Sequence, residues 1–326
     1  MFADRKVNVL VTGVGAIIGY GVIKSLKKSK YDVNIVGMDI YDDAVGQHWC
    51  DKFIQAIYAV DDNYISFLKK IIDDNKIDIV FFGTEQEIYR CETSKEELGD
   101  YYNKLVINKN ELLELSKDKW KTREALLQNG LEQYAIPSVI EGTYESISEQ
   151  WGKEFLLKPR SSYASKGIHR VDNKADFDFY SAKMGDNFMA QRLIGDNEHE
   201  YTVGAFGLDN GDCAGMIQLK RKLSQEGATV KAESIHDPMI EETVKWMCRV
   251  FKPVGPTNFQ FRKDGDNLYL LEVNPRISSS TSIRMAFGYN EAEMCIGYFL
   301  AHEVPSINVK NGRATRFIDE VVLVNE

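Results

Sequence analysis

The sequence has few cysteines, and they follow no regular spacing. Five are spread over 326 residues, at positions 50, 91, 213, 248 and 295, and no two of them form a Cys-x-x-Cys pair. An odd number of scattered cysteines favours neither a disulfide framework nor a zinc site. The pattern suits a reducing compartment, so we predict a cytoplasmic protein.

The sequence also lacks a net basic charge and long hydrophobic runs. The net charge of −9 argues against a nucleic-acid partner, because affinity for a phosphate backbone rests largely on basic patches. The start, MFADRKVNVLVTG, has no charged region leading into an apolar run, and no window approaches the ~18 apolar residues of a membrane span. We therefore predict neither export nor a membrane partner.

Strand and helix patterns alternate in the first third of the chain. A β-branched run at residues 6–12, a glycine turn with a helix, and a second strand at 33–40 form a βαβ unit. A helix near 62–74 and strands at 77–83 and 104–108 continue the alternation. This composition predicts an open α/β domain with a parallel sheet.

Beyond residue 110 the pattern changes to α+β. Two short helices come first; Ser116 or Asp118 can cap the second, and Gly130 can end it in a left-handed conformation. A strand-rich region follows from about residue 132.

A polar face is predicted on a hairpin in TNFQFRKDGDNLYLLEVN, residues 257–274. With the loop centred near Asp266, Gln260 lies opposite Glu272 and Asn258 opposite Asn274. Oxygens of this kind, together with phosphate oxygens, suit Mg²⁺. A solvated edge hairpin is the alternative. The alternation assigns four apolar side chains to the reverse face: Phe259, Phe261, Leu271 and Val273.

Two lysines stand where phosphate contacts are expected. Lys158 ends the apolar strand FLLKP and precedes the small polar loop RSSYASKG, whose backbone N–H groups could fold over a triphosphate. Lys119 begins a capped helix. Either one alone could be an ordinary surface lysine. The linker in MAQRLIGDNEHEYTV, residues 189–203, could offer backbone hydrogen bonds to adenine.

A dinucleotide site is a weaker interpretation. The stretch TGVGAIIG has the spacing G-x-G-x-x-x-G, one residue longer than the fingerprint, although Asp39 follows the second strand as a ribose-binding acid would. Tyr163 and Lys166 are three residues apart, whereas a short-chain dehydrogenase needs four. An NAD(P)-dependent oxidoreductase is therefore disfavoured.

Five segments in order resemble the nucleotide site of the ATP-grasp superfamily: SKDKW, LLKPRSSYASKG, AQRLIGDNEHEYTV, GPTNFQFR and LLEVNPRISSSTSIR. They are most similar to one synthetase module of the carbamoyl phosphate synthetase large subunit. The resemblance implies a Rossmann-like pre-ATP-grasp domain (1–110), a small lid subdomain with linking helices (111–190), and a C-terminal subdomain carrying the metal site (191–326).

The resemblance also implies the site residues. Nucleotide contacts would come from Lys119, Lys158, Ser165, Gly167, Gln191, Arg192, Leu193 and Glu200, the last holding the ribose. Gln260, Glu272 and Asn274 would ligate two Mg²⁺ (or Mn²⁺) ions, with Glu272 bridging them. Arg276 would neutralise the γ-phosphate. Many relatives carry an acid in place of Gln260, and their phosphate loops are richer in glycine.

The implied activity is that of an ATP-dependent carboxylate-amine, or carboxylate-thiol, ligase acting on a small metabolite through an acyl phosphate. Arg284, in a predicted helix, could hold the acceptor carboxylate, or be a surface arginine. Arg221 is a weaker candidate for a second anion contact, and Glu85 is expected to face the ligand crevice of an open sheet. A non-catalytic nucleotide-binding regulator is the alternative, and a homodimer is a further expectation.

Overall fold

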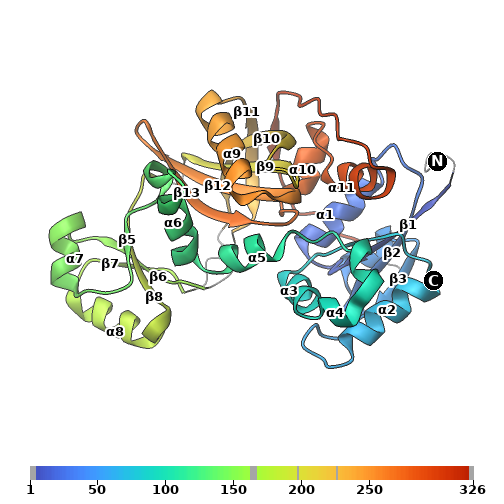
Figure 1. The fold of residues 1–326 in the computed structure, drawn as a ribbon, viewed down its shortest axis with the longest axis horizontal. Coiled ribbons are helices and arrows are strands. Elements are labelled where there is room, and N and C mark those ends of the chain that lie inside the picture. Colours follow the sequence, from blue (N-terminus) through green and yellow to red (C-terminus); the bar gives the residue numbers. More distant parts are fainter. Residues whose placement is uncertain (1–4, 162–166, 197, 225–226, 323–326) are drawn as a thin grey trace.

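The described strands form three sheets. The computed structural model describes residues 5–161, 167–196, 198–224 and 227–322. In chain order we call the sheets the first, middle and large sheets. Figure 1 shows the large sheet in the centre of the elongated molecule, with the first and middle sheets at opposite ends.

The first sheet is parallel, as the alternating pattern predicts, and has the order β3-β2-β1-β4. Its strands are β1 (Val7–Thr12), β2 (Val33–Asp39), β3 (Lys52–Gln55) and β4 (Ile79–Phe81). Its helices are α1 (Ile17–Leu26), α2 (Tyr64–Asp74), α3 (Glu85–Thr93) and α4 (Lys95–Leu98). The strand predicted at 104–108 is wrong. Only Leu105 bridges to Val80, because the Ile107 N–H turns back to the Leu105 carbonyl.

Two helices link the first sheet to the rest of the chain. They are α5 (Asn110–Lys117) and α6 (Lys119–Gln128). The predicted cap is confirmed for Asp118, whose carboxylate accepts hydrogen bonds from the Trp120 and Lys121 N–H groups. Gly130 follows α6 at φ +71°, the left-handed conformation expected of it.

The middle sheet has its own small core. Its order is β5-β8-β6-β7, and the pairs β5·β8, β6·β8 and β6·β7 are antiparallel. Its elements are β5 (Ser138–Val139), α7 (Tyr144–Trp151), β6 (Phe155–Pro159), β7 (His169–Val171), α8 (Lys174–Met184) and β8 (Phe188–Arg192). Phe155 of β6 packs edge-on against Phe177 of α8, and both are buried.

The large sheet is covered by helices on both faces. Its order is β13-β12-β9-β10-β11-β14. Its strands are β9 (Glu200–Leu208), β10 (Cys213–Leu223), β11 (Thr229–Ile235), β12 (Val254–Asp264), β13 (Asn267–Asn274) and β14 (Arg313–Thr315). Helix α9 (Pro238–Phe251) packs on one face with Phe259 and Phe261. Helices α10 (Thr281–Ala286) and α11 (Glu291–Cys295) lie on the other.

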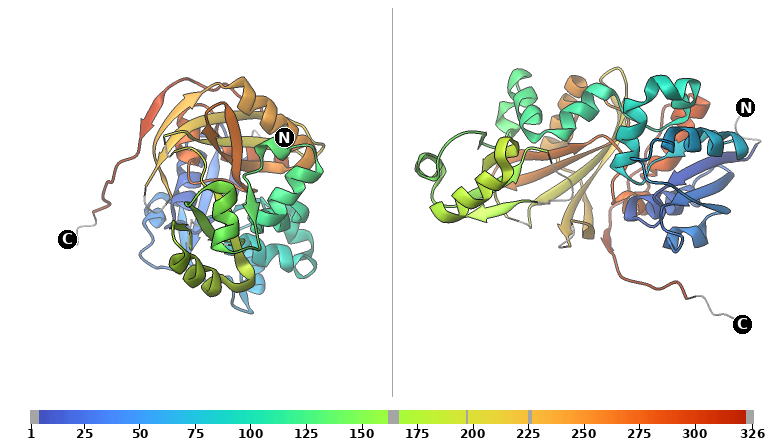
Figure 2. Two further views of the ribbon diagram at one scale, coloured as in Figure 1. Left: turned by 90° about the vertical axis from the view of Figure 1, so that its left-hand side faces the viewer. Right: turned by 90° about the horizontal axis from the view of Figure 1, so that it is seen from below.

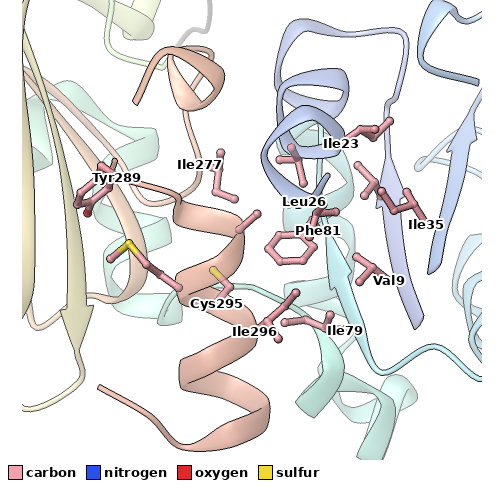
Figure 3. Close-up of a cluster of buried hydrophobic side chains, with 14 of the residues drawn as sticks. Val9, Ile23, Leu26, Ile35, Ile79, Phe81, Ile277, Tyr289, Cys295 and Ile296 are labelled. Atoms are coloured by element: carbon pink, nitrogen blue, oxygen red, sulfur yellow. The ribbon is translucent and has the colours of Figure 1, made fainter. Parts of the chain in front are cut away.

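One hydrophobic cluster joins the first sheet to the large sheet. Ile296, at the end of α11, lies beside Ile79 and Phe81 of β4 (Figure 3). Cys295 is in the same cluster, and all four side chains are at most 1% exposed. Gly21 of α1 leaves room for α10, since a Cβ there would lie 2.9 Å from Thr281 Cγ2. Burial of this size fixes the two sheets relative to each other.

The hairpin of β12 and β13 has the predicted register with one bulge. Gln260 pairs with Glu272 and Asn258 with Asn274, as predicted. Beyond Gln260 the register shifts by one residue, so Phe261 pairs with Leu270. The prediction that Leu271 joins the apolar face is therefore wrong: Leu270 is in the core, and the extra residue Leu271 is only half-buried.

The chain beyond β14 runs away from the body of the molecule (Figure 2). It carries several exposed apolar side chains: Phe317, Ile318, Val321 and Val322. No helix in the described part of the chain is both long and apolar enough to cross a membrane.

Candidate functional site

A pocket lies between the middle sheet, α6 and the β13 edge of the large sheet. It brings together four residues predicted from the sequence: Lys119, Lys158, Gln191 and Glu272. The remaining lining residues are Ser116, Thr122, Arg123, Leu126, Ala135, Ile136, Leu270, Leu271 and Val273. Cations and a carboxylate thus share one cleft with apolar side chains, an arrangement suited to a ligand with a flat apolar part and an anionic part.

Lys158 is the most perturbed cation in this pocket. It is buried at the end of β6, and its ammonium donates to Gln191 Oε1 at 2.6 Å. Gln191 in turn donates to Ser138 Oγ at 2.9 Å. Burial, reinforced by repulsion from Lys119, lowers the pKa of Lys158 to about 7. Among the described residues no carboxylate pairs with this buried ammonium, which favours an anionic ligand.

The start of α6 is anchored beside this lysine. The Arg160 guanidinium binds the capping carboxylate of Asp118 at 2.6 Å, and the Lys119 N–H donates to the Arg160 carbonyl at 2.9 Å. Burial lowers the pKa of Lys119, while the nearby Glu272 and Asp118 carboxylates oppose that shift. Two cations therefore approach the pocket from different elements.

Three oxygen-bearing side chains meet on the polar face of the hairpin. Glu272 Oε1 accepts hydrogen bonds from the amides of Gln260 and Asn274, the latter at 2.9 Å. The amide oxygens of Gln260 and Asn274 in turn accept hydrogen bonds from the Arg221 and Arg276 guanidinium groups. Among the described residues no group of three or more His, Cys, Asp or Glu could hold a metal. A cation here would therefore need amide oxygens and ligand oxygens as well.

Arg276 extends this polar row toward the first sheet. Its guanidinium donates to Asn274 Oδ1 at 3.2 Å and, from Nε, to Glu85 Oε1 at 2.8 Å. Glu85 is the first residue of α3, where the helix dipole favours a carboxylate. The row Gln260–Glu272–Asn274–Arg276 thus ends at the carboxyl edge of the parallel sheet, the usual ligand crevice of such sheets.

Comparisons with known proteins identify the fold that carries this pocket. Residues 189–319 match a family model described as ATP-grasp in the biosynthetic pathway with Ter operon. Solved structures cover most of the chain at low identity. Biotin carboxylase from Campylobacter jejuni superposes with a TM-score of 0.74 and 17% identity, covering 94% of this chain and 74% of that one. N5-carboxyaminoimidazole synthetase from Staphylococcus aureus, complexed with ADP, gives 0.72 and 17%, covering 95% and 81%. The chain has the ATP-grasp fold.

Curated relatives match only a part of the chain. The carbamoyl phosphate synthase large chain of Thermotoga maritima is 22% identical over 225 residues, which is 60% of this chain and 19% of the relative. The matched segment therefore spans about a fifth of that relative's length.

Within the ATP-grasp fold, two predicted contacts are not where they were expected. The Glu200 carboxylate is buried between Arg221 and Arg262, which donate to Oε1 and Oε2, both at 2.8 Å. Both carboxylate oxygens already accept hydrogen bonds from these arginines. The structure therefore does not support the prediction that Glu200 binds the ribose. Glu198, two residues earlier, is exposed and pairs with Lys222 at 3.1 Å.

Arg284 is buried, although the sequence predicted a contact with the acceptor carboxylate or a place on the surface. Its side chain is 0% exposed and forms a salt bridge of 2.9 Å with Glu291, which is equally buried. The same guanidinium donates to Thr202 Oγ1 at 3.0 Å and to Asn258. An acceptor cannot reach it without unpacking α10, so we reassign Arg284 from substrate binding to holding α10 and α11 on the large sheet.

Three further predicted residues, Gly167, Arg192 and Leu193, do not line the pocket. Arg192 is exposed, 3.8 Å from Asp264, and Leu193 is half-buried. Gly167 has φ +77°, and a Cβ would lie 2.9 Å from Pro159 Cγ, so only glycine fits there without strain. Ser165 lies outside the described residues.

Leu271 is the pocket residue that the sequence pattern assigned to the wrong face. It lines the pocket next to Glu272 because of the bulge. Regular alternation predicts the opposite face, and no glycine marks the bulge in the sequence. A bulge of this kind can be found only by testing which of two adjacent leucines the core requires.

The dinucleotide interpretation loses its ribose-binding acid. Asp39 is 6% exposed, and its carboxylate accepts hydrogen bonds from the Gly15 N–H at 2.7 Å and the Tyr41 N–H at 3.1 Å. The carboxylate therefore binds the backbone of the glycine loop itself, and is not available to the ribose of a dinucleotide.

Proposed function

We propose that the protein is an ATP-dependent ligase that joins a small carboxylate to an amine or a thiol. The observation that carries this proposal is the meeting of Lys158, Gln191 and Glu272 in one pocket between the middle and large sheets. In this proposal the apolar wall that includes Leu271 receives the adenine. Lys119 and Lys158 contact the phosphates, aided by the backbone N–H of Gly167.

The proposed metal ligands are Gln260, Glu272 and Asn274. One carboxylate and two amides fit Mg²⁺, or Mn²⁺, because these ions prefer oxygen ligands and commonly share them with nucleotide phosphates. Bound metal would supply positive charge to the transferring phosphoryl group. A structural relative, the biotin carboxylase domain of Hydrogenobacter thermophilus 2-oxoglutarate carboxylase, was solved in complex with MgADP and bicarbonate, which supports this cofactor choice.

The proposed reaction has two steps. A carboxylate oxygen of the acceptor attacks the γ-phosphorus, the bond to the β,γ-bridging oxygen breaks, and ADP leaves. The amine or thiol then attacks the acyl carbon of the acyl phosphate and expels inorganic phosphate. Arg276 offsets the charge that builds up when two anions meet, and Glu85 holds the Arg276 guanidinium in place.

Glu198 is the better proposed ribose contact. It is exposed in the linker after β8, and its partner Lys222 is itself a surface side chain, so a ribose hydroxyl could displace it at little cost. Glu198→Ala should weaken ATP binding, whereas Glu200→Ala should mainly destabilise the fold by removing the carboxylate that Arg221 and Arg262 share.

The proposal also divides the chain into three structural units. We propose a Rossmann-like pre-ATP-grasp domain over residues 1–110, followed by a lid and a C-terminal subdomain. Strand β8 (Phe188–Arg192) pairs with the middle sheet, which favours ending the lid after residue 192 rather than at 190. Small-molecule substrates, a cytoplasmic location and a homodimer complete the proposal.

Release of ADP tests the proposed activity. The purified protein is incubated with Mg-ATP and paired pools of carboxylates and amines, and ADP is measured. ADP that forms only when a carboxylate is present supports the ligase. Tight Mg-ATP binding with no ADP release from any pool would favour the non-catalytic regulator.

A further inference from the structure

Arg316 is a half-buried cation that the proposed reaction does not use. It follows β14, and its N–H donates to the Val230 carbonyl at 2.8 Å, which fixes its backbone to the edge of the large sheet. Its Nη2 donates to the Ser279 carbonyl at 2.9 Å. Nη1 is buried and has no hydrogen-bond partner among the described residues.

No carboxylate neutralises this guanidinium in the described part of the chain. The salt bridges found there include none to Arg316, whereas Arg313, three residues earlier, pairs with Glu233 at 3.3 Å. Burial lowers the pKa of Arg316, and only Tyr20 opposes that shift. A desolvated cation held by one carbonyl is unfavourable unless an anion completes its surroundings.

Arg316 lies near the carboxyl edge of the first sheet. Tyr20, close enough to act on it electrostatically, is in the first turn of α1, at the carboxyl edge of the first sheet. That helix has no side-chain cap and no acid in its first turn, and the preceding Gly15 and Ala16 are exposed. The helix dipole therefore adds positive potential to the same crevice.

The contact with Ser279 places Arg316 close in the structure to Arg276, the proposed γ-phosphate contact. Ser279 lies three residues after Arg276, and three residues of chain reach at most roughly 10 Å. A small metabolite can span that distance. A molecule whose reacting carboxylate lies at Arg276 would bring its far end near Arg316.

We propose that Arg316 binds a second anionic group of the acceptor, a carboxylate or a phosphate, separate from the carboxylate that is phosphorylated. This inference rests on the proposed function and narrows its substrate class to acids with two anionic groups. Arg284, which the sequence suggested for an acceptor carboxylate, is sealed in the core and leaves that role open.

Calorimetry with paired probes tests this site. With Mg²⁺ and a non-hydrolysable ATP analogue present, we compare succinate with butyrate, and phosphoglycolate with glycolate. Each pair differs by one anionic group, and the two pairs distinguish a carboxylate from a phosphate. At least one dianion should bind the wild-type protein about 10- to 100-fold more tightly than its monoanionic partner, the range of a charge-assisted hydrogen bond.

The variants separate binding from folding. Arg316→Met should abolish the preference for the dianion, and Arg316→Lys should keep part of it. Arg313→Met, which changes an exposed arginine three residues earlier in β14, should leave it unchanged. The inference is overturned if no dianion binds the wild-type protein better than its partner, or if Arg316→Met keeps the full preference. Failure of the ATP analogue to bind the wild-type protein would instead overturn the proposed function. Equal binding of the analogue to every variant shows that a lost preference comes from Arg316 and not from a damaged nucleotide site.

Discussion

The Arg276 guanidinium lies 2.8 Å from the Glu85 carboxylate, although the two residues are 191 positions apart. Arg276 follows the strand that carries Glu272, and Glu85 begins a helix of the first sheet. This pair connects the first sheet directly to the polar row of the proposed site. The shared hydrophobic cluster around Phe81 makes the connection rigid.

Glu85→Gln should slow ADP release about 10- to 100-fold and leave Mg-ATP affinity nearly unchanged. The variant keeps the shape of the side chain but removes the charge that orients Arg276, and small misplacements of a catalytic group cost rates of this order. Glu233→Gln, in an exposed pair with Arg313, is the matched control and should have little effect. Full activity of Glu85→Gln would show that the pair is only structural.

ATP affinity should fall as the pH rises above 7. The pKa of Lys158 is lowered to about 7 by burial, so the free protein loses this positive charge between pH 6 and 8. Phosphate binding favours the ammonium and raises its pKa, so each further pH unit should cost up to about tenfold in affinity.

Binding of a fluorescent ATP analogue from pH 6 to 9 measures this dependence. Lys158→Met should bind weakly, and should show only the pH dependence that the nucleotide itself contributes. Identical pH profiles for the wild-type protein and Lys158→Met would contradict the role of this lysine.

The two adjacent leucines of β13 should behave in opposite ways. Leu270→Ala removes a core side chain and should lower the free energy of unfolding by about 2 to 5 kcal/mol. Leu271→Ala should cost little stability but weaken nucleotide binding, because this residue lines the pocket without belonging to the core cluster, whereas Leu270 belongs to both. Denaturant unfolding and calorimetry on both variants check the pair. A large loss of stability in Leu271→Ala and a small one in Leu270→Ala would contradict the bulge and support a regular alternation along β13.

Local patterns in the sequence predicted a large part of this structure. The turn-rich loop set the pairing of Gln260 with Glu272, and the side chain of Asp118 caps α6 as its position suggested. Both features depend on a few neighbouring residues. The pocket that collects Lys119 and Lys158 was expected from the resemblance of ordered segments.

Features that depend on distant partners were not predictable in this way. Arg284 is buried because Glu291 and Asn258 meet it across two helices and a strand, and nothing in its own segment signals that pairing. Glu200 has its carboxylate occupied by Arg221, 21 residues away. The bulge at Leu271 likewise follows from how the core packs.

The central claim is that Glu272 binds the metal that accompanies ATP. Its most direct test is ATP affinity measured over a Mg²⁺ titration for the wild-type protein, Glu272→Gln and Gln260→Glu. Glu272→Gln keeps the shape and the hydrogen-bonding reach but removes the charge that offsets divalent ions. Mg²⁺ should strengthen ATP binding in the wild-type protein and in Gln260→Glu, whereas Glu272→Gln should lose this dependence while remaining folded. Equal Mg²⁺ dependence in Glu272→Gln and the wild-type protein would contradict this role of Glu272. It would favour the alternative that the polar face of the hairpin is simply solvated.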